Sequence, residues 1–306
     1  METELFYLPT PIVELQSPLI QQAEIKLLIK REDQNHPFVS GNKWWKLKYN
    51  LEEAMKDGQT TLLTFGGAYS NHIYAIAAAA HELGLKSIGI IRGEETLPLN
   101  STLSFAKASG MQLHYVSREA YRNKTEPSFI EQLHNQFEDF YLVPEGGTNE
   151  LAVKGCGEFA KQLSAEVDFD YLCLPVGTGG TIAGMIEGLD ESKKVNGFPS
   201  LKGANFLEDE IRKYSVKKNW QLMYDYHFGG YAKRTKELTE FMDQFEKEFN
   251  IPLDPIYTSK MMFGVMDLIK KKFFEAGSTI LVIHTGGLQG RAGLISDHTS
   301  QPRKDS

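Results

Sequence analysis

Five short stretches of the sequence combine glycine with side chains that can bind anions or react with carbonyl groups. In one of them, "SGNKWWKLKYN" at 40–50, Lys43 directly follows Gly-Asn. The other four each follow a β-rich run: "GGAYSNH" at 66–72, "GTGGT" at 177–181, "GGYAK" at 229–233 and "HTGG" at 284–287. Ligands of open parallel sheets bind outside the carboxyl ends of the strands, so we expect the function in these loops.

The run "PVGTGGTIAG" predicts an anion site that suits a phosphate. It follows a buried strand and opens a helix, so free backbone N–H groups and the positive helix end meet there. The residues concerned are Gly177, Thr178, Gly179, Gly180 and Thr181. The spacing matches neither the dinucleotide-binding nor the P-loop pattern. A glycine turn that only lets a helix pack closely on a sheet is the alternative.

The run "FGGAYSNHIYAIAAAA" has the same design, with two glycines after a strand and Ser70 and Asn71 at a helix start. Ser and Asn are common N-caps, so a purely structural role for Ser70 is a fair alternative. The double glycine indicates more, because it lets backbone amides approach a second anion such as a substrate carboxylate.

The neighbouring motifs indicate a chemical role for Lys43. A lysine is exposed by default, and Lys43 alone would be assigned to the surface. A phosphate site, a carboxylate site and a lysine beside Gly-Asn are, however, the three parts that hold pyridoxal 5'-phosphate as a Schiff base.

These residues resemble a known family. The motifs "SGNKWWKLKYNL", "GGAYSNH", "PEGGTNELAVKG", "GTGGTIAGM", "LDPIYTSKMM" and "VIHTGG", in this order, are similar to those of 1-aminocyclopropane-1-carboxylate deaminases and D-cysteine desulfhydrases. The resemblance covers about residues 8 to 287. It implies an α/β chain of two lobes, each a mostly parallel sheet covered by helices, in the tryptophan synthase β-like fold (fold type II).

The resemblance assigns roles to individual residues. Lys43 would bind the cofactor, Asn71 its phenolic oxygen, and the loop 177–181 its phosphate, while Tyr231 and Tyr257 would line the pocket. The implied catalytic set is Lys43, Ser70, Tyr231 and Tyr257. The implied cofactor set is Lys43, Asn71, Gly177, Thr178, Gly179, Gly180, Thr181, Tyr257, Thr258 and Thr285. Ser70, Asn71 and His72 would bind the substrate carboxylate. Without the family, aromatic packing explains the two tyrosines about equally well.

Thr258 and Thr285 favour the desulfhydrases within this family, in which the deaminases carry Glu and Leu at the matching positions. A carboxylate beside the cofactor's ring nitrogen favours its protonated form, whereas a hydroxyl can pair with the neutral form. The weaker electron sink suits β-elimination of a good leaving group.

The implied reaction starts when the amino acid displaces Lys43 from the cofactor and its carboxylate settles at the Ser70 helix end. The freed Lys43 amine then removes the Cα proton, and D-cysteine yields hydrogen sulfide, pyruvate and ammonia. Burial and neighbouring cations can lower the pKa of a lysine enough for this role. Lys46 lies one helical turn from Lys43 if the segment is helical, although a surface position for Lys46 is as well supported.

The elements that must position these residues alternate between strand and helix. From residue 61 to 165, β-rich runs at 61–65, 87–91, 112–116 and 140–143 alternate with helical stretches, which predicts parallel β-α-β units. The pattern continues with strands at 171–176, 220–226 and 278–285 and helices from about 180, at 233–249 and at 259–275. By resemblance, residues 1–46 with 152–306 form the large cofactor-binding domain, and residues 47–151 form the small mobile domain.

Composition limits the alternatives further. The 33 basic and 40 acidic residues give a net charge of −7 without a basic face, so nucleic acid is not an expected partner. The most apolar run, at 73–85, is too short for a membrane span and predicts a buried helix. Two cysteines and scattered histidines predict neither disulfides nor a metal site. The N-terminal residues do not resemble an export signal. We therefore expect a cytoplasmic enzyme with a small amino-acid substrate, and the resemblance implies a homodimer.

Three functions remain open in order of preference. The first is β-elimination from D-cysteine, and the second is 1-aminocyclopropane-1-carboxylate deamination to 2-oxobutanoate and ammonia. The third is a non-catalytic protein of the same fold that binds the cofactor or an amino acid. Trp44 and Trp45 stand where relatives often have Thr-Arg, and "LQGRAGLISD" replaces the usual apolar closing segment. These differences bear on the choice of substrate and leave the cofactor motifs intact.

Overall fold

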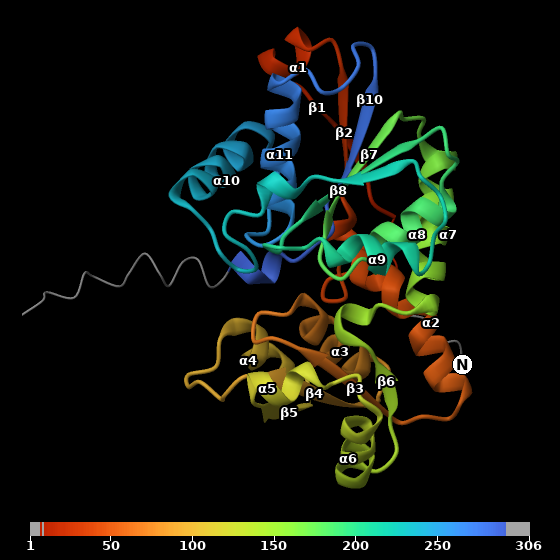
Figure 1. The fold of residues 1–306 in the computed structure, drawn as a ribbon. Helices are drawn as coiled ribbons and strands as arrows, with labels where there is room; N and C mark the ends of the chain where they lie inside the picture. Colours follow the sequence, from red (N-terminus) through yellow and green to blue (C-terminus); the bar gives the residue numbers. More distant parts are fainter. Residues whose placement is uncertain (1–6, 8, 292–306) are drawn as a thin grey trace, which may run out of the picture.

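The computed structural model describes residue 7 and residues 9–291, which form two sheets one above the other (Figure 1). The upper sheet has six strands in the order β1-β2-β10-β7-β8-β9, and only the β1–β2 pair is antiparallel. The lower sheet has four parallel strands in the order β5-β4-β3-β6. The upper strands are β1 (Ile12–Leu15), β2 (Lys26–Lys30), β7 (Tyr171–Val176), β8 (Lys194–Pro199), β9 (Trp220–Leu222) and β10 (Thr279–Ile283). The lower strands are β3 (Thr61–Gly66), β4 (Lys86–Arg92), β5 (Met111–Val116) and β6 (Tyr141–Val143).

Helices cover both sheets. Around the lower sheet lie α3 (Asn71–Glu82), α4 (Ser101–Ala108), α5 (Arg118–Arg122) and α6 (Pro127–Phe137). The upper sheet is flanked by α1 (Pro18–Gln22), α7 (Glu150–Glu166), α8 (Gly180–Gly188), α9 (Phe206–Arg212), α10 (Lys236–Phe249) and α11 (Thr258–Lys270). The helix α2 (Asn42–Lys56) passes between the levels of the two sheets in Figure 1. Short 3-10 turns complete the chain: η1 (Glu32–Gln34), η2 (Glu145–Gly147), η3 (Tyr224–Tyr226) and η4 (Leu288–Arg291).

The α/β fold with parallel sheets and the strand–helix alternation predicted from residue 61 onward are confirmed. One predicted strand is too long, because the segment 220–226 pairs only over β9 and then turns into η3. The sequence patterns missed β1, β2 and β8. The strand β8 reads "KVNGFP", whose glycine, proline and asparagine hide a strand that is buried from its second residue on. The domain boundaries at 46/47 and 151/152 stay a prediction.

The helices α2, α7 and α8 pack so closely that glycine is required where they touch. A Cβ atom at Gly155 of α7 would lie 2.1 Å from the Trp45 carbonyl oxygen of α2. A Cβ atom at Gly188 of α8 would lie 2.3 Å from the Gly157 carbonyl oxygen of α7. Real side chains never approach this closely, so these glycines set the position of α2 and of the lysine at its start.

The predicted buried helix is α3, in which Ile73, Ile76 and the run Ala77–Ala80 are at most 3% exposed. One cluster of buried apolar side chains joins residues of both sheets, such as Leu62 of β3 and Leu172 of β7. The loops that follow β3, β6, β7 and β10 meet between the sheets. No helix within the described residues is both long and apolar enough to cross a membrane.

Candidate active site

Lys43 is the second residue of α2, after the N-cap Gly41 and Asn42. Gly41 has φ +69°, and a Cβ atom there would lie 1.9 Å from the Thr285 carbonyl oxygen, so glycine is required for both reasons. The Lys43 Nζ donates to Asn42 Oδ1 at 3.0 Å. Burial lowers the pKa of Lys43 to about 8, although Cys156 and Asp254 act in the opposite direction. About one tenth of the Lys43 amine is therefore neutral at pH 7, far more than at the ordinary pKa of 10.5.

The turn before Lys43 is held by two buried residues that the sequence patterns did not reveal. The Gly41 amide donates to Asn35 Oδ1 at 2.8 Å and to the Glu32 carbonyl, and Asn35 Nδ2 donates back to the Gly41 carbonyl at 3.0 Å. The Glu32 side chain accepts from Asn35 Nδ2 at 2.9 Å and from Trp45 Nε1 at 2.7 Å. These bonds fix the backbone that presents Lys43.

The predicted phosphate loop connects β7 to α8. Gly179, in the left-handed region with φ +85°, is the N-cap of α8, so the first amides of that helix are free of intrahelical partners. Asn42 Nδ2 donates to Thr181 Oγ1 at 2.8 Å, which brings the Lys43 turn to the edge of this loop. A Cβ atom at Gly180 would lie 2.8 Å from the Thr148 side chain, so the loop is closely lined as well.

Lys46 is buried at 2% exposure, so the surface position that the sequence left open for it is wrong. Its Nζ donates to the Gly146 carbonyl, to Thr148 Oγ1 at 2.9 Å and to Thr178 Oγ1 at 3.4 Å. It thereby links α2 to the loop after β6 and to the phosphate loop. Burial and then the charge of Lys43 lower the pKa of Lys46 to about 7. The helical i, i+3 spacing from Lys43, noted in the sequence, is present, since both residues lie in α2.

These groups fit the phosphate of pyridoxal phosphate. Backbone amides, the hydroxyls of Thr178 and Thr181 and the Lys46 amine converge at the loop, and all of them can donate hydrogen bonds to an anion. Tyr257 lies against this loop, because its ring would be 3.2 Å from a Cβ atom at Gly177. The aldehyde of the cofactor requires an amine nearby, and Lys43 supplies one.

The second predicted anion loop ends at the start of α3. Ser70 is its N-cap, and Ser70 Oγ accepts from the amides of His72 at 3.2 Å and Ile73 at 3.3 Å. The structural alternative for Ser70 is therefore real, but capping uses the lone pairs of the hydroxyl and leaves its proton for a ligand. Arg92, at the end of β4, extends over the loop, with Nη2 3.4 Å from a Cβ position at Gly67. Its charge favours a carboxylate there.

The His72 side chain points toward the lower sheet. It is 2% exposed, and Nε2 lies 2.8 Å from Thr64 Oγ1 of β3. Burial, followed by the charges of Lys43 and Lys46, places the pKa of His72 well below its ordinary value. The imidazole is thus neutral and faces Thr64. Only the backbone amide of His72 lies at the N-terminus of α3.

Tyr231 and Tyr257 lie together, with ring centroids 6.2 Å apart at 67°. The Tyr231 hydroxyl donates to the Tyr69 carbonyl at 3.3 Å, which connects the segment after η3 to the loop after β3. Burial raises the pKa of Tyr231 to about 12 and that of Tyr257 well above its ordinary value. Both phenols are therefore neutral and can donate hydrogen bonds.

The Thr258 hydroxyl has partners inside its own turn. It donates to Asp254 Oδ1 at 2.8 Å and accepts from the Asp254 amide at 2.8 Å. Asp254 is 1% exposed and also accepts from the amides of Ile256 and Tyr257, so its carboxylate caps the start of α11. Burial raises the pKa of Asp254. Contact between Thr258 and the cofactor stays a prediction. It requires the Thr258 hydroxyl to release its hydrogen bond to the Asp254 carboxylate.

The strip Thr285–Gly287 after β10 brings the parts together. The Thr285 carbonyl lies against Gly41, next to Lys43. A Cβ atom at Gly287, which has φ +91°, would lie 2.5 Å from Asn71 Nδ2 and 3.2 Å from Asp254 Cγ. The residues predicted at 43, 71, 178, 181, 257, 258 and 285 therefore belong to one region.

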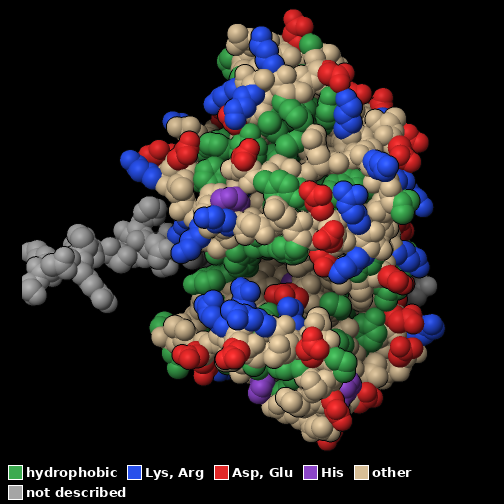
Figure 2. All heavy atoms as spheres, viewed as in Figure 1, with side chains coloured by type: hydrophobic (Ala, Val, Ile, Leu, Met, Phe, Trp, Pro, Cys, Tyr) green, Lys and Arg blue, Asp and Glu red, His purple; other side chains and the backbone are tan. Residues whose placement is uncertain are grey.

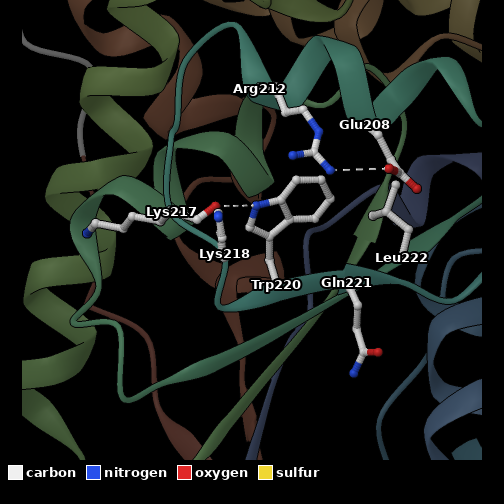
Figure 3. A pocket seen from close by; sticks show the side chains of 7 residues that line it. All are labelled: Glu208, Arg212, Lys217, Lys218, Trp220, Gln221 and Leu222. Carbon is white, nitrogen blue, oxygen red and sulfur yellow. Dashed lines mark hydrogen bonds and ion pairs between the residues drawn. The ribbon is translucent and has the colours of Figure 1, made fainter.

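Figure 2 shows a hollow in the surface between the upper and lower halves of the molecule, with Lys and Arg side chains gathered on its lower rim. A different pocket of about 360 Å³ lies at the edge strand β9, where Trp220 faces Arg212 of α9 (Figure 3). None of the predicted site residues lines that pocket. We therefore place the candidate active site between the sheets.

Comparison with known proteins identifies the family. The sequence pattern described as "Pyridoxal-phosphate dependent enzyme" matches residues 3–286. The chain belongs to this family. Pyridoxal phosphate is accordingly its cofactor, and the predicted enzyme class is confirmed.

Individual relatives agree with the motifs. A Pyrococcus horikoshii protein provisionally named a 1-aminocyclopropane-1-carboxylate deaminase is 32% identical over 94% of this chain and 90% of its own. The Arabidopsis thaliana mitochondrial bifunctional D-cysteine desulfhydrase/1-aminocyclopropane-1-carboxylate deaminase is 31% identical over 94% of this chain and 78% of its own. A crystal structure of a 1-aminocyclopropane-1-carboxylate deaminase homologue, 30% identical, superimposes with a TM-score of 0.83 over 96% of this chain and 95% of its own.

Proposed function

We propose that this enzyme catalyses β-elimination from a small amino acid, with D-cysteine as the preferred substrate and hydrogen sulfide, pyruvate and ammonia as products. The observation that carries the proposal is the amine of Lys43, with its lowered pKa, at the start of α2, next to both the phosphate loop and the strip after β10. A third relative, a Klebsiella pneumoniae protein named D-cysteine desulfhydrase, is 28% identical over 93% of both chains.

The bound cofactor supplies an electrophile for the substrate amino group and a sink for the electrons released at Cα. The protein supplies the rest. The Ser70 hydroxyl and the Asn71 amide, at the N-terminus of α3, bind the substrate carboxylate, which the positive charge of Arg92 favours. The amides of His72 and Ile73 donate to Ser70 Oγ and so hold that hydroxyl in place. Lys43, as a neutral amine, accepts the Cα proton.

Lys46 and Tyr257 complete the roles that we propose. The Lys46 amine, whose pKa burial and Lys43 lower to about 7, lies against Thr178. The negative charge of a bound phosphate favours the protonated form of Lys46, which then balances that charge. Tyr257 and Tyr231 stay protonated, so either hydroxyl can donate a proton to a departing sulfur atom. Asn71 would hold the cofactor through its phenolic oxygen, and Thr285, on the strip after β10, would hold it from the other side.

The test measures sulfide and pyruvate from the purified enzyme with D-cysteine while the visible spectrum of the bound cofactor is recorded. A spectral shift together with sulfide release supports the proposal. A shift without sulfide or pyruvate would keep the cofactor and exclude the substrate. A Lys43→Ala variant must lose the reaction, and unchanged behaviour of this variant would favour the non-catalytic alternative.

A second candidate is 1-aminocyclopropane-1-carboxylate deamination. Thr258 disfavours this activity only as a partner of the ring nitrogen, and its hydroxyl donates to Asp254 in this structure. Faster release of 2-oxobutanoate from 1-aminocyclopropane-1-carboxylate than of pyruvate from D-cysteine would place this activity first.

We also propose that the enzyme is a homodimer with a small mobile domain at 47–151 and a large domain formed by 1–46 with 152–306. Light scattering at micromolar concentration tests the dimer, because a monomer mass contradicts it. Cys156 and Cys173 are buried free thiols, which suits a reducing compartment such as the cytoplasm. Cell fractionation tests that location.

A further inference from the structure

Gln289 connects the end of the upper sheet to the helix that starts at the carboxylate loop. It lies in η4, in the segment "LQGRAG" directly after the strip that follows β10. Its Nε2 donates to Asn71 Oδ1 at 2.6 Å. Both side chains are half-buried. This hydrogen bond thus connects the turn that follows the six-stranded sheet to α3, which covers the four-stranded sheet.

The turn that carries Gln289 is held in place from its other end. Arg291 pairs with Glu246 of α10 and donates to the Leu253 carbonyl at 3.3 Å. The Gly290 amide donates to the Gly287 carbonyl at 3.0 Å. Gln289 therefore meets Asn71 from a fixed backbone.

The bond decides which end of the Asn71 amide faces the site. An asparagine side chain has one carbonyl oxygen and one NH₂ group on opposite sides. With the oxygen bonded to Gln289, the NH₂ group is turned the other way, toward the strip at Gly287. The same strip contacts the turn that leads to Lys43. Asn71 thus presents a donor, and not an acceptor, to the place where the ring of the cofactor is expected.

We propose that Gln289 is a positioning residue that fixes Asn71 as a hydrogen-bond donor toward the bound pyridoxal phosphate. The inference rests on the cofactor role that we propose for Asn71. Without the Gln289 donor the Asn71 amide can rotate, and an acceptor oxygen facing the electronegative phenolic oxygen weakens binding.

Two substitutions at Gln289 separate orientation from packing. Gln289→Leu removes the donor and leaves the Asn71 amide free to turn. Gln289→Glu offers only an acceptor, so Asn71 must donate its NH₂ group to the new carboxylate and turn its oxygen to the site. The same two substitutions at Gln244, which is exposed on α10, serve as controls.

The experiment measures the dissociation constant of pyridoxal phosphate by quenching of tryptophan fluorescence, and the pH at which the visible band of the bound cofactor changes. Gln289→Leu should weaken binding by up to about tenfold, the effect of one hydrogen bond, and Gln289→Glu should weaken it more. The pH of the spectral change should rise in Gln289→Glu, because the ionised phenolic oxygen loses its donor. In an Asn71→Ala background neither substitution should alter either quantity.

The proposal would be overturned if Gln289→Glu bound the cofactor as tightly as the parent and changed its spectrum at the same pH. Asn71 would then already present its oxygen to the site in the parent, opposite to the orientation proposed. Losses that persist in the Asn71→Ala background would also overturn it, since Gln289 would then act without Asn71. Both quantities are measured without substrate, so a failure of D-cysteine turnover leaves this test intact.

Discussion

Replacing Glu32 by leucine should destabilise the protein by an amount that its hydrogen bonds define. The Glu32 side chain is fully buried. One carboxylate oxygen accepts from Thr10 Oγ1 at 2.6 Å and from the Tyr7 hydroxyl at 3.3 Å. The other accepts from Trp45 Nε1 at 2.7 Å and Asn35 Nδ2 at 2.9 Å.

Leucine has a similar volume but accepts no hydrogen bond. The hydroxyls of Thr10 and Tyr7 can rotate to other partners, whereas the Trp45 N–H and one Asn35 proton stay buried and unpaired. Each such donor costs about 1–3 kcal/mol, so Glu32→Leu should lower the free energy of unfolding by about 2–6 kcal/mol. Because Asn35 also holds Gly41, the variant should bind pyridoxal phosphate more weakly.

Glu32→Gln is the matched control. The amide oxygen can accept from Trp45 and Asn35, and the NH₂ group can donate to the two hydroxyls, so all four partners remain paired. The free energy of unfolding should therefore stay within about 1 kcal/mol of the parent.

The two variants should also differ in pH dependence. Burial raises the pKa of Glu32 from the ordinary value of 4.5. Between the ordinary pKa and the raised pKa of the folded protein, the folded state binds more protons than the unfolded state. The parent therefore loses stability as the pH rises through this range, and Glu32→Gln, which does not titrate, should not show this loss.

Urea unfolding of the three proteins at equal cofactor concentration tests these values. The midpoints should move while the slope stays constant. A Glu32→Leu protein within about 1 kcal/mol of the parent, or a Glu32→Gln protein as unstable as Glu32→Leu, would refute the hydrogen-bond argument.

Three further predictions concern the site and its support. The rate at which the cofactor-free protein binds pyridoxal phosphate covalently should follow the neutral fraction of Lys43, rising with pH and levelling off above a pKa of about 8; a flat profile between pH 6 and about 9 in stopped-flow absorbance contradicts this. Lys46→Met should weaken cofactor binding by about tenfold or more, because one charge-assisted bond of about 1.5–3 kcal/mol is lost, and fluorescence titration measures it with Lys48→Met as the control. Gly155→Ala should destabilise the fold by about 1–3 kcal/mol through the clash with the Trp45 carbonyl, whereas a melting temperature equal to that of the parent would show that α2 and α7 can separate freely.

The chain from residue 61 to 188 was predictable because its structure follows local patterns. The apolar composition of β7 and the alanine-rich composition of α3 are enough to predict that both elements are buried. The glycines after β3 and β7 mark tight turns before helices. Ser70, Asn71 and the loop 177–181 were found for the same reason.

The environment of Lys46 and the role of Glu32 were not predictable, because their partners are distant in the chain. Lys46 bonds to Gly146 and Thr148, about one hundred residues away, and to Thr178, further still. The Thr258 hydroxyl, assigned from the motif to the cofactor, is engaged by Asp254 four residues earlier. The pattern D-x-x-x-T of a helix start could have suggested this contact.

The sequence by itself determined the cofactor family, because the motif order and the residue types of the two anion loops are properties of short segments. Only the tertiary structure decided which groups surround Lys43, lower the pKa of Lys43 and Lys46, and turn the Asn71 amide toward the strip after β10. The physical reason is that burial and hydrogen-bond direction depend on atoms brought together from both sheets, and neither quantity is encoded in any single stretch of the chain.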